Sequence, residues 1–314
     1  MVVPVRFGAG GYGMDVPDLS GYKITYTAPH TPGETFILHT MLDAEADEQR
    51  VVLKEGGFAG GSGSVEFTTD ESVNRYGVRP VGFTVPEFGG SLDVAVRRGP
   101  DESVMDTLRD WRRAWSHFDE GLLKVVARDG GNREARVRLV GFADVPHDPA
   151  QNYTFEDQVQ FRCMDGFWRG PTMRREGAFE VAVPGDLPPL LRLRWDGETE
   201  TSFKLPSGLK VNLTTRRTPG LPPGSVEIVP GVVVDLGPGF AVGDPVPIGT
   251  RYINLERGMQ GQITREDGTV DSFTWSSMRG VLVGETLTPH RLYSFELGPG
   301  LELLATPRYL TPWR

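Results

Sequence analysis

Apolar residues recur every three or four positions in one stretch of the chain, which is the period of one face of an α-helix. These positions are Val104, Leu108, Trp111, Trp115 and Phe118. Asp101 and Ser103 can cap the start, and Ser103 with Asp106 three residues later forms a weak capping box. Gly121 is a stop signal. The pattern predicts one amphipathic helix over residues 101–119, and its two tryptophans require a broad apolar surface to pack on.

Strand patterns follow this helix directly. Residues 122–128 are largely apolar, and residues 133–142 alternate between apolar and polar side chains, as in a half-buried strand. The Asp129-Gly130-Gly131-Asn132 segment between them is a hairpin signal. Residues 158–163 alternate in the same way. We therefore expect an antiparallel sheet on which the helix packs.

The order of these segments resembles a known family. The helix ends in Arg-Ala-Trp, the hairpin turn reads Arg-Asp-Gly-Gly-Asn-Arg, and the long strand closes on Asp-Gly-Phe-Trp at residues 165–168. This order is similar to the amino-terminal domain of the siphophage distal tail proteins (Dit), also called phage minor tail proteins or siphovirus tail components. The resemblance covers residues 1–180 most closely. It implies a structural virion protein and no enzymatic activity.

Prolines mark the expected domain boundary. Pro184, Pro188 and Pro189 lie close together, and such spacing resists regular structure. Beyond them, short strands alternate with turn signals, which is typical of a β-sandwich. Residues 292–297 and 301–305, on either side of Gly298-Pro299-Gly300, are expected to form a closing hairpin. The segment order here resembles the galectin-like carboxy-terminal domain of the same family.

The fold prediction is therefore a mainly β protein of two antiparallel β-sandwich domains. Residues 1–183 form the first, which carries the helix on its sheet and forms the ring. Residues 184–314 form the second, which is galectin-like. The 40 glycines and 25 prolines among 314 residues agree with strands joined by many turns. No apolar run reaches the length of a membrane-spanning helix, and the glycine-rich start is not expected to be a signal peptide.

Charge and cysteine content limit the chemistry. The net charge is −9, and residues 1–186 carry all of it, because the residues from Leu187 onward hold 13 basic and 13 acidic side chains. An acidic surface disfavours nucleic-acid binding but suits the wall of a channel that DNA passes without sticking. The single cysteine, Cys163, excludes an internal disulfide and is expected to be a small core residue.

No catalytic, cofactor or metal site is expected. The five histidines are scattered without ligand spacing. The aspartates at 129, 196, 235 and 267 mostly occupy turn positions, although a pair of carboxylates on facing strands, as in glycosidases, stays open. The glycine-rich residues 56–63 are expected to form a flexible loop, and no Lys-Ser/Thr or helix follows that would make it bind phosphate.

Two groups of side chains are candidates for contacts between subunits. The first is a set of charges that could form salt bridges across a subunit boundary or could simply be solvated: Arg97, Arg98, Asp106, Arg109, Asp110, Arg112 and Arg113. The second is the pair Phe167 and Trp168, which could pack between domains or anchor a neighbouring subunit. Trp195 and Trp275 could stack on a sugar, but their alternation with apolar residues favours a place in the core.

The resemblance implies an assembly. It predicts a homohexameric ring at the tail tip, in the distal tail or baseplate hub, assembled in the host cytoplasm. The ring would join the tail tube protein and the tape measure protein to the tail-tip fibre or lysin protein, and DNA would pass through it during ejection without specific binding. The alternative is a carbohydrate-binding module that recognises the host. The two differ in whether the protein forms a ring or binds cell-wall glycans.

Overall fold

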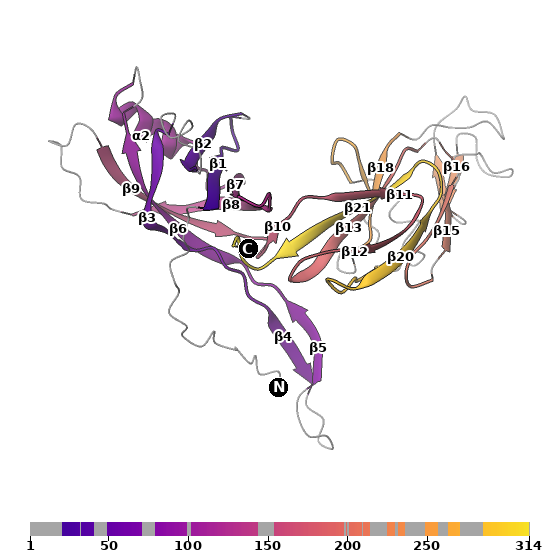
Figure 1. The fold of residues 1–314 in the computed structure, drawn as a ribbon. Helices are drawn as coiled ribbons and strands as arrows, with labels where there is room; N and C mark the ends of the chain where they lie inside the picture. Colours follow the sequence, from indigo (N-terminus) through magenta and orange to yellow (C-terminus); the bar gives the residue numbers. More distant parts are fainter. Residues whose placement is uncertain are drawn as a thin grey trace. The chain divides into compact units, whose positions relative to one another are not determined.

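The chain forms two compact units, and the second is inserted into the first. The computed structural model describes residues 21–31, 33–40, 49–70, 79–98, 102–143, 154–197, 199, 201–208, 210–213, 225–229, 232–235, 249–256, 263–270 and 285–313. The first unit is Met1–Gly170 with Tyr309–Arg314, and the second is Pro171–Arg308 (Figure 1). The sequence placed the change of domain after residue 183 and put the last residues in the second domain. The units instead divide at Gly170, and the end of the chain returns to the first unit.

The first unit is a β-sandwich with one helix among its described residues. Its strands are β1 (Tyr22–Thr27), β2 (Thr35–His39), β3 (Val51–Gly60), β4 (Glu66–Asp70), β5 (Arg79–Thr84), β6 (Phe88–Arg97), β7 (Gly121–Ala127), β8 (Asn132–Phe142), β9 (Thr154–Cys163) and β10 (Trp168–Arg169). Helix α2 spans Val104–Arg113. The predicted fold class, mainly β with antiparallel sheets and one helix, is confirmed for the described part of the chain.

Strand β8 joins the two layers of this sandwich. Its first half, Asn132–Val137, pairs with β7, which continues through β1 to β2. Its second half, from Arg138, pairs with β9, which continues through β6 to β3. The β7–β8 hairpin was predicted from its turn, and Gly131 N–H donates to the Asp129 carboxylate there (2.9 Å). The long alternating strand β8 is therefore a member of both sheets.

An aromatic cluster fills the core under the helix. Trp111 and Trp115 are both buried, as predicted. Tyr26 of β1 stacks on Trp115 with ring centroids 3.8 Å apart and meets Trp111 edge to face at 5.9 Å. Phe36 of β2 meets Trp111 at 5.2 Å. The helix is therefore held by aromatic packing against β1 and β2, in addition to its contacts with β6 and β9.

The helix is capped by the predicted residues, but it begins later and ends earlier than predicted. Ser103 and Asp106 form both halves of the capping box. The predicted span to residue 119 is wrong, since α2 ends at Arg113 and Ala114 is its C-cap. The Tyr26 hydroxyl donates to the Ala114 carbonyl (2.9 Å), which satisfies a group that helix ends leave open.

A tight turn then separates the helix from β7. The Ser116 hydroxyl accepts from Phe118 N–H and Asp119 N–H (3.1 and 3.0 Å), so the backbone leaves the helical path. Phe118, expected on the buried stripe, is consequently 84% exposed. Gly121 is not the helix stop. It lies in β7, where a Cβ would meet the Tyr26 hydroxyl at 2.3 Å.

The glycine-rich segment predicted to be a flexible loop is largely strand. β3 runs through Gly56 and Gly57 to Gly60 and pairs with β6 on both sides of an irregularity between Leu53 and Phe58. A Cβ on Gly57 would lie 2.4 Å from the Asp93 carbonyl. The glycines therefore allow a bulge with close backbone approach, which is a structural role in a paired strand.

The second unit is also a sandwich of two antiparallel sheets. One contains β11 (Met173–Glu176), β21 (Leu301–Tyr309), β13 (Leu187–Trp195), β18 (Arg251–Asn254) and β19 (Ile263–Arg265). The other contains β12 (Ala178–Ala182), β20 (Leu292–Leu297), β14 (Thr201–Lys204) and β15 (Lys210–Leu213). β16 (Ser225–Val229) pairs with β17 (Val232–Asp235). Inward residues of both larger sheets share one core.

The expected closing hairpin is wrong. β20 pairs with β12 and β14, whereas β21 pairs with β13 and β11. The turn at Gly298-Pro299-Gly300 therefore carries the chain from one sheet to the other. Gly298 N–H donates to the carbonyl of Ser202 in β14 (2.8 Å). The Gly300 carbonyl accepts from the N–H of Asp196, the residue after β13 (3.1 Å), so the two ends of the turn are bonded to different parts of the unit.

Candidate functional site

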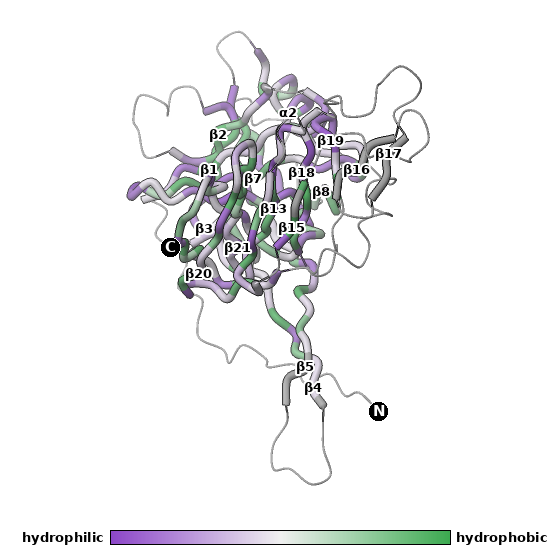
Figure 2. The backbone as a smooth tube through the Cα atoms, turned by 90° about the vertical axis from the view of Figure 1, so that its right-hand side faces the viewer, coloured by the Kyte–Doolittle hydropathy of each residue, from purple (hydrophilic) through white to green (hydrophobic). Residues whose placement is uncertain are grey.

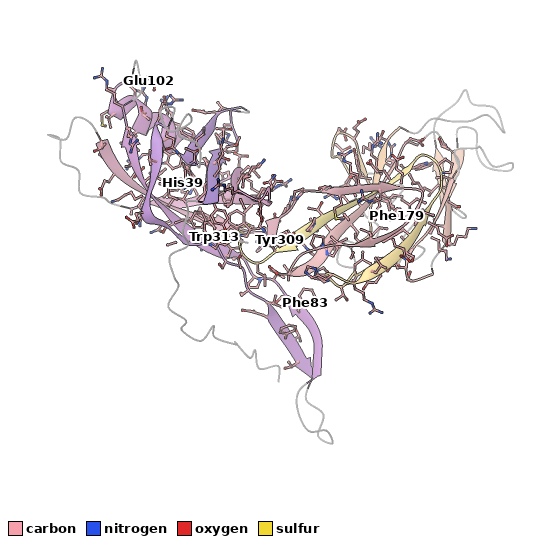
Figure 3. The ribbon with its side chains drawn as sticks, viewed as in Figure 1. His39, Phe83, Glu102, Phe179, Tyr309 and Trp313 are labelled. Atoms are coloured by element: carbon pink, nitrogen blue, oxygen red, sulfur yellow. The ribbon has the colours of Figure 1, made fainter. Side chains whose placement is uncertain are left out.

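A two-stranded hairpin stands away from the sandwich of the first unit. β4 and β5 pair only with each other among the described strands, and both views show them projecting (Figures 1 and 2). Phe67 and Phe83 face each other in the register. Both are exposed, at 46% and 44%, and Phe83 is drawn well outside the packed layers (Figure 3). The hairpin therefore presents aromatic surface that the described residues cover only in part.

Close backbone contacts fix the root of this hairpin. Gly63, where the chain enters it, donates its N–H to the Leu310 carbonyl (2.7 Å). A Cβ on Gly63 would lie 2.2 Å from the Gly166 carbonyl, and a Cβ on Gly166, whose φ is +76°, would lie 2.3 Å from the Pro86 carbonyl. The turn in the Asp-Gly-Phe-Trp segment thus lies against both legs of the hairpin, and only glycine fits at these two positions.

Trp168 packs against the root of the hairpin from the core of the unit. It is fully buried, its Nε1–H donates to the Gly61 carbonyl (2.7 Å), and its ring stacks on Phe88 at 5.9 Å. The side chain therefore presents no surface to a neighbouring subunit in this structure. Phe167 is also buried, with the Arg169 guanidinium 5.8 Å from its ring centre. A contact of Phe167 with another subunit stays a prediction.

The end of the chain packs on the same unit. The Trp313 ring meets Tyr22 and Phe58 edge to face at 5.3 and 5.1 Å. The Arg133 guanidinium donates to the Thr311 carbonyl (2.7 Å) and lies 3.8 Å from the centre of the Tyr309 ring (Figure 3). These contacts hold the backbone on both sides of Leu310. The carbonyl of Leu310, which accepts the hydrogen bond at the hairpin root, is thereby kept in place.

The three arginines of the helix differ in what they contact. Arg112 reaches Asp157 on β9 with two hydrogen bonds, Nε–Oδ2 at 3.2 Å and Nη2–Oδ1 at 2.9 Å, and it lies over the Phe142 ring at 5.1 Å. The Asp157 side chain is fully buried. Arg112 therefore binds the helix to the sheet within one subunit. Its guanidinium consequently has fewer free N–H groups for the predicted contact with a neighbouring subunit.

Arg109 and Arg113 lie on the open side of the helix. Arg109 pairs with Asp106 (2.8 Å) and approaches Asp110 (3.9 Å), both on its own helix and both exposed. Two causes hold the pKa of the Asp106 carboxyl below its usual value. Hydrogen bonds from Ser103 are the larger cause, and the charge of Arg109 is the smaller one. Arg113 is exposed and forms no ion pair with a described residue. Arg97, the last residue of β6, and Arg98 after it are also exposed. A role between subunits stays a prediction for all these side chains.

The second unit places the predicted sugar-stacking residues differently. Trp195 is buried in the core of the unit, and its Nε1–H donates to the Thr199 carbonyl (3.0 Å). Its indole is therefore not accessible to a sugar, in agreement with the core interpretation. Trp275 lies outside the described residues. Asp196 and Asp267 accept hydrogen bonds from turn residues three and two positions later, as expected for turn aspartates.

Groups for other chemistry are not assembled in the described part of the chain. There, no three His, Cys, Asp or Glu side chains are grouped so that they could hold a metal ion. Cys163 is buried, and burial raises the pKa of its thiol to about 11. None of the described helical residues form a helix long and apolar enough to cross a bilayer.

Comparison with known proteins gives a structural likeness only. The sequence matches no protein-family model and no curated protein. The fold is similar to the Dit protein of SPP1, described as a paradigm of the hub adsorption apparatus in phages that infect Gram-positive bacteria. The TM-score is 0.51 with 12% identity, over 91% of this chain and 99% of that chain. At this identity the likeness shows the fold and does not by itself fix the function.

Two baseplate structures give lower scores. The phage P2 baseplate in its activated conformation with Ca is matched with a TM-score of 0.46 and 7% identity, over 91% of this chain and 98% of that one. The corresponding structure with Sr is matched with a TM-score of 0.42 and 9% identity, over 91% and 97%. These scores are too low to support an argument about this chain.

The sequence did not indicate the hairpin as a functional element. The patterns of residues 65–69 and 79–85 predict two further strands and do not indicate that these strands leave the sandwich. The sequence held no signal that the hairpin projects, because Val81, Phe83 and Val85 alternate as in an ordinary half-buried strand.

Proposed function

We propose that this protein is a structural component of the tail tip of a long-tailed bacteriophage, the distal tail protein of its baseplate hub. The observation that carries the proposal is the extent of the likeness to the SPP1 Dit protein. It covers 91% of this chain and 99% of that one, so both units are matched rather than one common sandwich. The order of the helix, the hairpin turn and the Asp-Gly-Phe-Trp segment supports the same family.

In this proposal, copies of the first unit form a closed ring, a homohexamer, at the end of the tail. The projecting hairpin favours such a ring. A two-stranded hairpin alone is marginally stable in water, and β4 and β5 have no other described partner. A neighbouring copy that covers Phe67 and Phe83 would supply the missing burial. A closed ring does this for every copy and leaves no free end.

The size of this contribution can be worked out. A phenylalanine buries about 200 Å² when fully covered, so covering the exposed part of each ring removes about 90 Å² from water. At about 25 cal/mol per Å² this gives about 2 kcal/mol for each phenylalanine. Two such residues at every subunit boundary are enough to act as anchors, since interface energy is concentrated in a few aromatic side chains.

Charge supports the passage of DNA through the ring. The acidic excess lies in the first 186 residues, which contain most of the unit proposed to form the wall. A negative wall repels the phosphate backbone and prevents DNA from binding during ejection. The remaining proposed partners are the tail tube and tape measure proteins on one side and the fibre or lysin protein on the other. The galectin-like character of the second unit is likewise proposed from the resemblance.

Light scattering coupled to size-exclusion chromatography tests the ring and the hairpin together. The wild-type chain is expected to elute as an oligomer at high concentration, and Phe67→Ser with Phe83→Ser is expected to elute as a single copy. Phe118→Ser is the matched control, because it also removes an exposed phenylalanine from the first unit, away from the hairpin. A wild-type chain that stays a single copy at high concentration would count against the ring. Loss of the oligomer only in the control would place the contact elsewhere.

A further inference from the structure

A cavity in the second unit lies where one sheet opens. It has a volume of about 380 Å³ and is lined by the end of β14 and the following turn on one side and by β20 on the other. β14 pairs with β20 only at Glu296 and Leu297. β14 ends at Lys204, so the edge of β20 from Leu292 to Phe295 is not bonded to β14. This leaves backbone polar groups of β20 at the cavity wall.

The side chains that line this cavity are mainly polar. Lys204 and Glu296 form an exposed ion pair at one end (2.8 Å). Arg291 lies at the other end, with its guanidinium 5.8 Å from the centre of the Tyr293 ring. Tyr293 is held in place because its hydroxyl accepts from Thr288 N–H (3.0 Å). The cavity thus combines donors, acceptors and a fixed aromatic ring.

The local charge favours an anion. Lys204 and Arg291 are the basic side chains that line the cavity, and Lys210 lies opposite Lys204 in the β14–β15 register. Three neighbouring carboxylates already accept hydrogen bonds, Glu296 from Lys204, Glu285 from Ser207 N–H (2.9 Å) and Glu180 from the Ser294 hydroxyl (3.2 Å). Arg291 forms no ion pair with a described residue. A guanidinium in this position can bind a carboxylate or phosphate with two parallel hydrogen bonds.

The turn before β20 holds Arg291 at the cavity. His290 is the only described non-glycine residue with a positive φ, at 61°. Its N–H donates to the Val183 carbonyl (2.9 Å), and Arg291 N–H donates to the Thr288 carbonyl (3.4 Å). These bonds fix the backbone of the turn in a conformation that residues other than glycine seldom adopt. The arginine is therefore presented from an ordered turn rather than from a loose end.

We propose that this cavity binds a saccharide unit that carries a phosphate or a carboxylate. Arg291 would take the anionic group. The Lys204–Glu296 pair supplies a donor and an acceptor side by side, which suits the hydroxyls of a sugar, since each can donate and accept. Exposed Leu292, on the same face of β20 as Glu296, offers apolar surface to the C–H face of the sugar. The volume lies in the lower part of the range for ligand pockets and suits one or two sugar rings.

Titration of the full chain, followed by ligand NMR and calorimetry, tests this site with four probes. They are glucose 1-phosphate, glucuronate, glucose and inorganic phosphate, and the first two distinguish a phosphate from a carboxylate. At least one anionic sugar is expected to bind, in the millimolar range, more tightly than glucose or phosphate alone. Arg291→Gln is expected to weaken binding at least about tenfold, because a charge-assisted pair is lost. Arg192→Gln, an exposed arginine on the other sheet of the same unit, is the matched control and is expected to bind as the wild type does.

Several results would overturn the inference. They are the absence of binding by all four probes up to tens of millimolar, equal binding of phosphate and sugar phosphate, and equal loss in both arginine variants. Leu292→Asp provides a second test, since it places a negative charge at the cavity from an exposed position and is expected to abolish binding without unfolding the chain. The site does not depend on the proposed ring, so a chain that assembles but binds no probe would refute this inference alone.

Discussion

The arginine that fastens the helix to the sheet allows a quantitative test. Arg112→Gln removes a guanidinium that makes two hydrogen bonds to Asp157 at 3.2 and 2.9 Å. The Asp157 side chain is fully buried, whereas 41% of the Arg112 side chain is exposed. Breaking a fully buried pair by removing one partner costs about 3–5 kcal/mol. Because water reaches the arginine side of this pair, we expect about 2–3 kcal/mol.

This loss converts into a measurable change in the unfolding temperature. A domain of 150–250 residues loses about 2–4 °C for each kcal/mol. The transition of the first unit is therefore expected to fall by about 4–12 °C in a calorimetric or circular-dichroism melt. Arg109→Gln and Arg113→Gln are matched controls on the same helix. Since Arg109 makes only exposed pairs on its own helix, its replacement is expected to cost about 0.5 kcal/mol or less.

A double-mutant cycle with Asp157→Asn isolates the pair itself. The double variant leaves no charge buried without a partner, so it is expected to be more stable than the sum of the single losses predicts, by about 1–3 kcal/mol. The reasoning would be refuted if Arg112→Gln melted together with Arg109→Gln, or if the two single losses simply added. Either result would mean that the helix is held by its aromatic packing alone.

Three further predictions concern the first unit. Gly166→Ala is expected to destabilise the hairpin root by more than about 1 kcal/mol, because the new Cβ would lie 2.3 Å from the Pro86 carbonyl at a φ of +76°. Gly130→Ala, at a φ of +88° with open space around it, is the control and should lose less in the same melt; equal losses would contradict the steric argument. Cys163 is expected to stay unmodified by a thiol reagent at pH 8 until the chain unfolds, since burial raises its pKa to about 11; rapid labelling of the folded chain would contradict this. Burial also raises the pKa of the Tyr26 hydroxyl above its ordinary value of 10.0, so its contribution to stability is complete below pH 10 and is lost as the pH rises beyond it. Tyr26→Phe should flatten that alkaline decline in urea unfolding, and an unchanged decline would assign it to other groups.

The sequence predicted those features that depend on neighbouring residues. The capping box of Ser103 and Asp106 spans three residues, and the turn at Asp129 is closed by its own side chain. The alternating strands around this turn formed the expected hairpin, and the buried tryptophans followed from helical spacing. The cap and the hairpin turn are each fixed by an interaction within a few positions of the residues that signal them.

Features fixed by distant parts of the chain were predicted less well. The helix ends at Ala114, whose carbonyl accepts from Tyr26, 88 positions away. Trp168 is buried where it donates to Gly61, 107 positions away. The turn at Gly298 has the composition of a hairpin turn, but its partners are in two different sheets. Local chemistry signals a turn in such cases and does not say which strands the turn joins.

The candidate surfaces show the same limit. An arginine pattern on a helix indicates which side chains lie outside the apolar stripe, but only the fold shows that Arg112 meets a buried carboxylate on β9. The exposed phenylalanines of β4 and β5 are separate in sequence and become a pair only through the register of the hairpin. The cavity beside β20 arises because β14 ends at Lys204 and leaves part of the edge of β20 unpaired with it, which no pattern within either strand indicates.

Negative-stain imaging of the purified full chain shows directly whether copies of this protein form a ring. We expect closed rings of six copies around a central hole, with the first units forming the wall. Hairpin variants Phe67→Ser with Phe83→Ser are predicted to give single particles under the same conditions. Wild-type images that show only single copies at high protein concentration, or open filaments without a hole, would contradict the account.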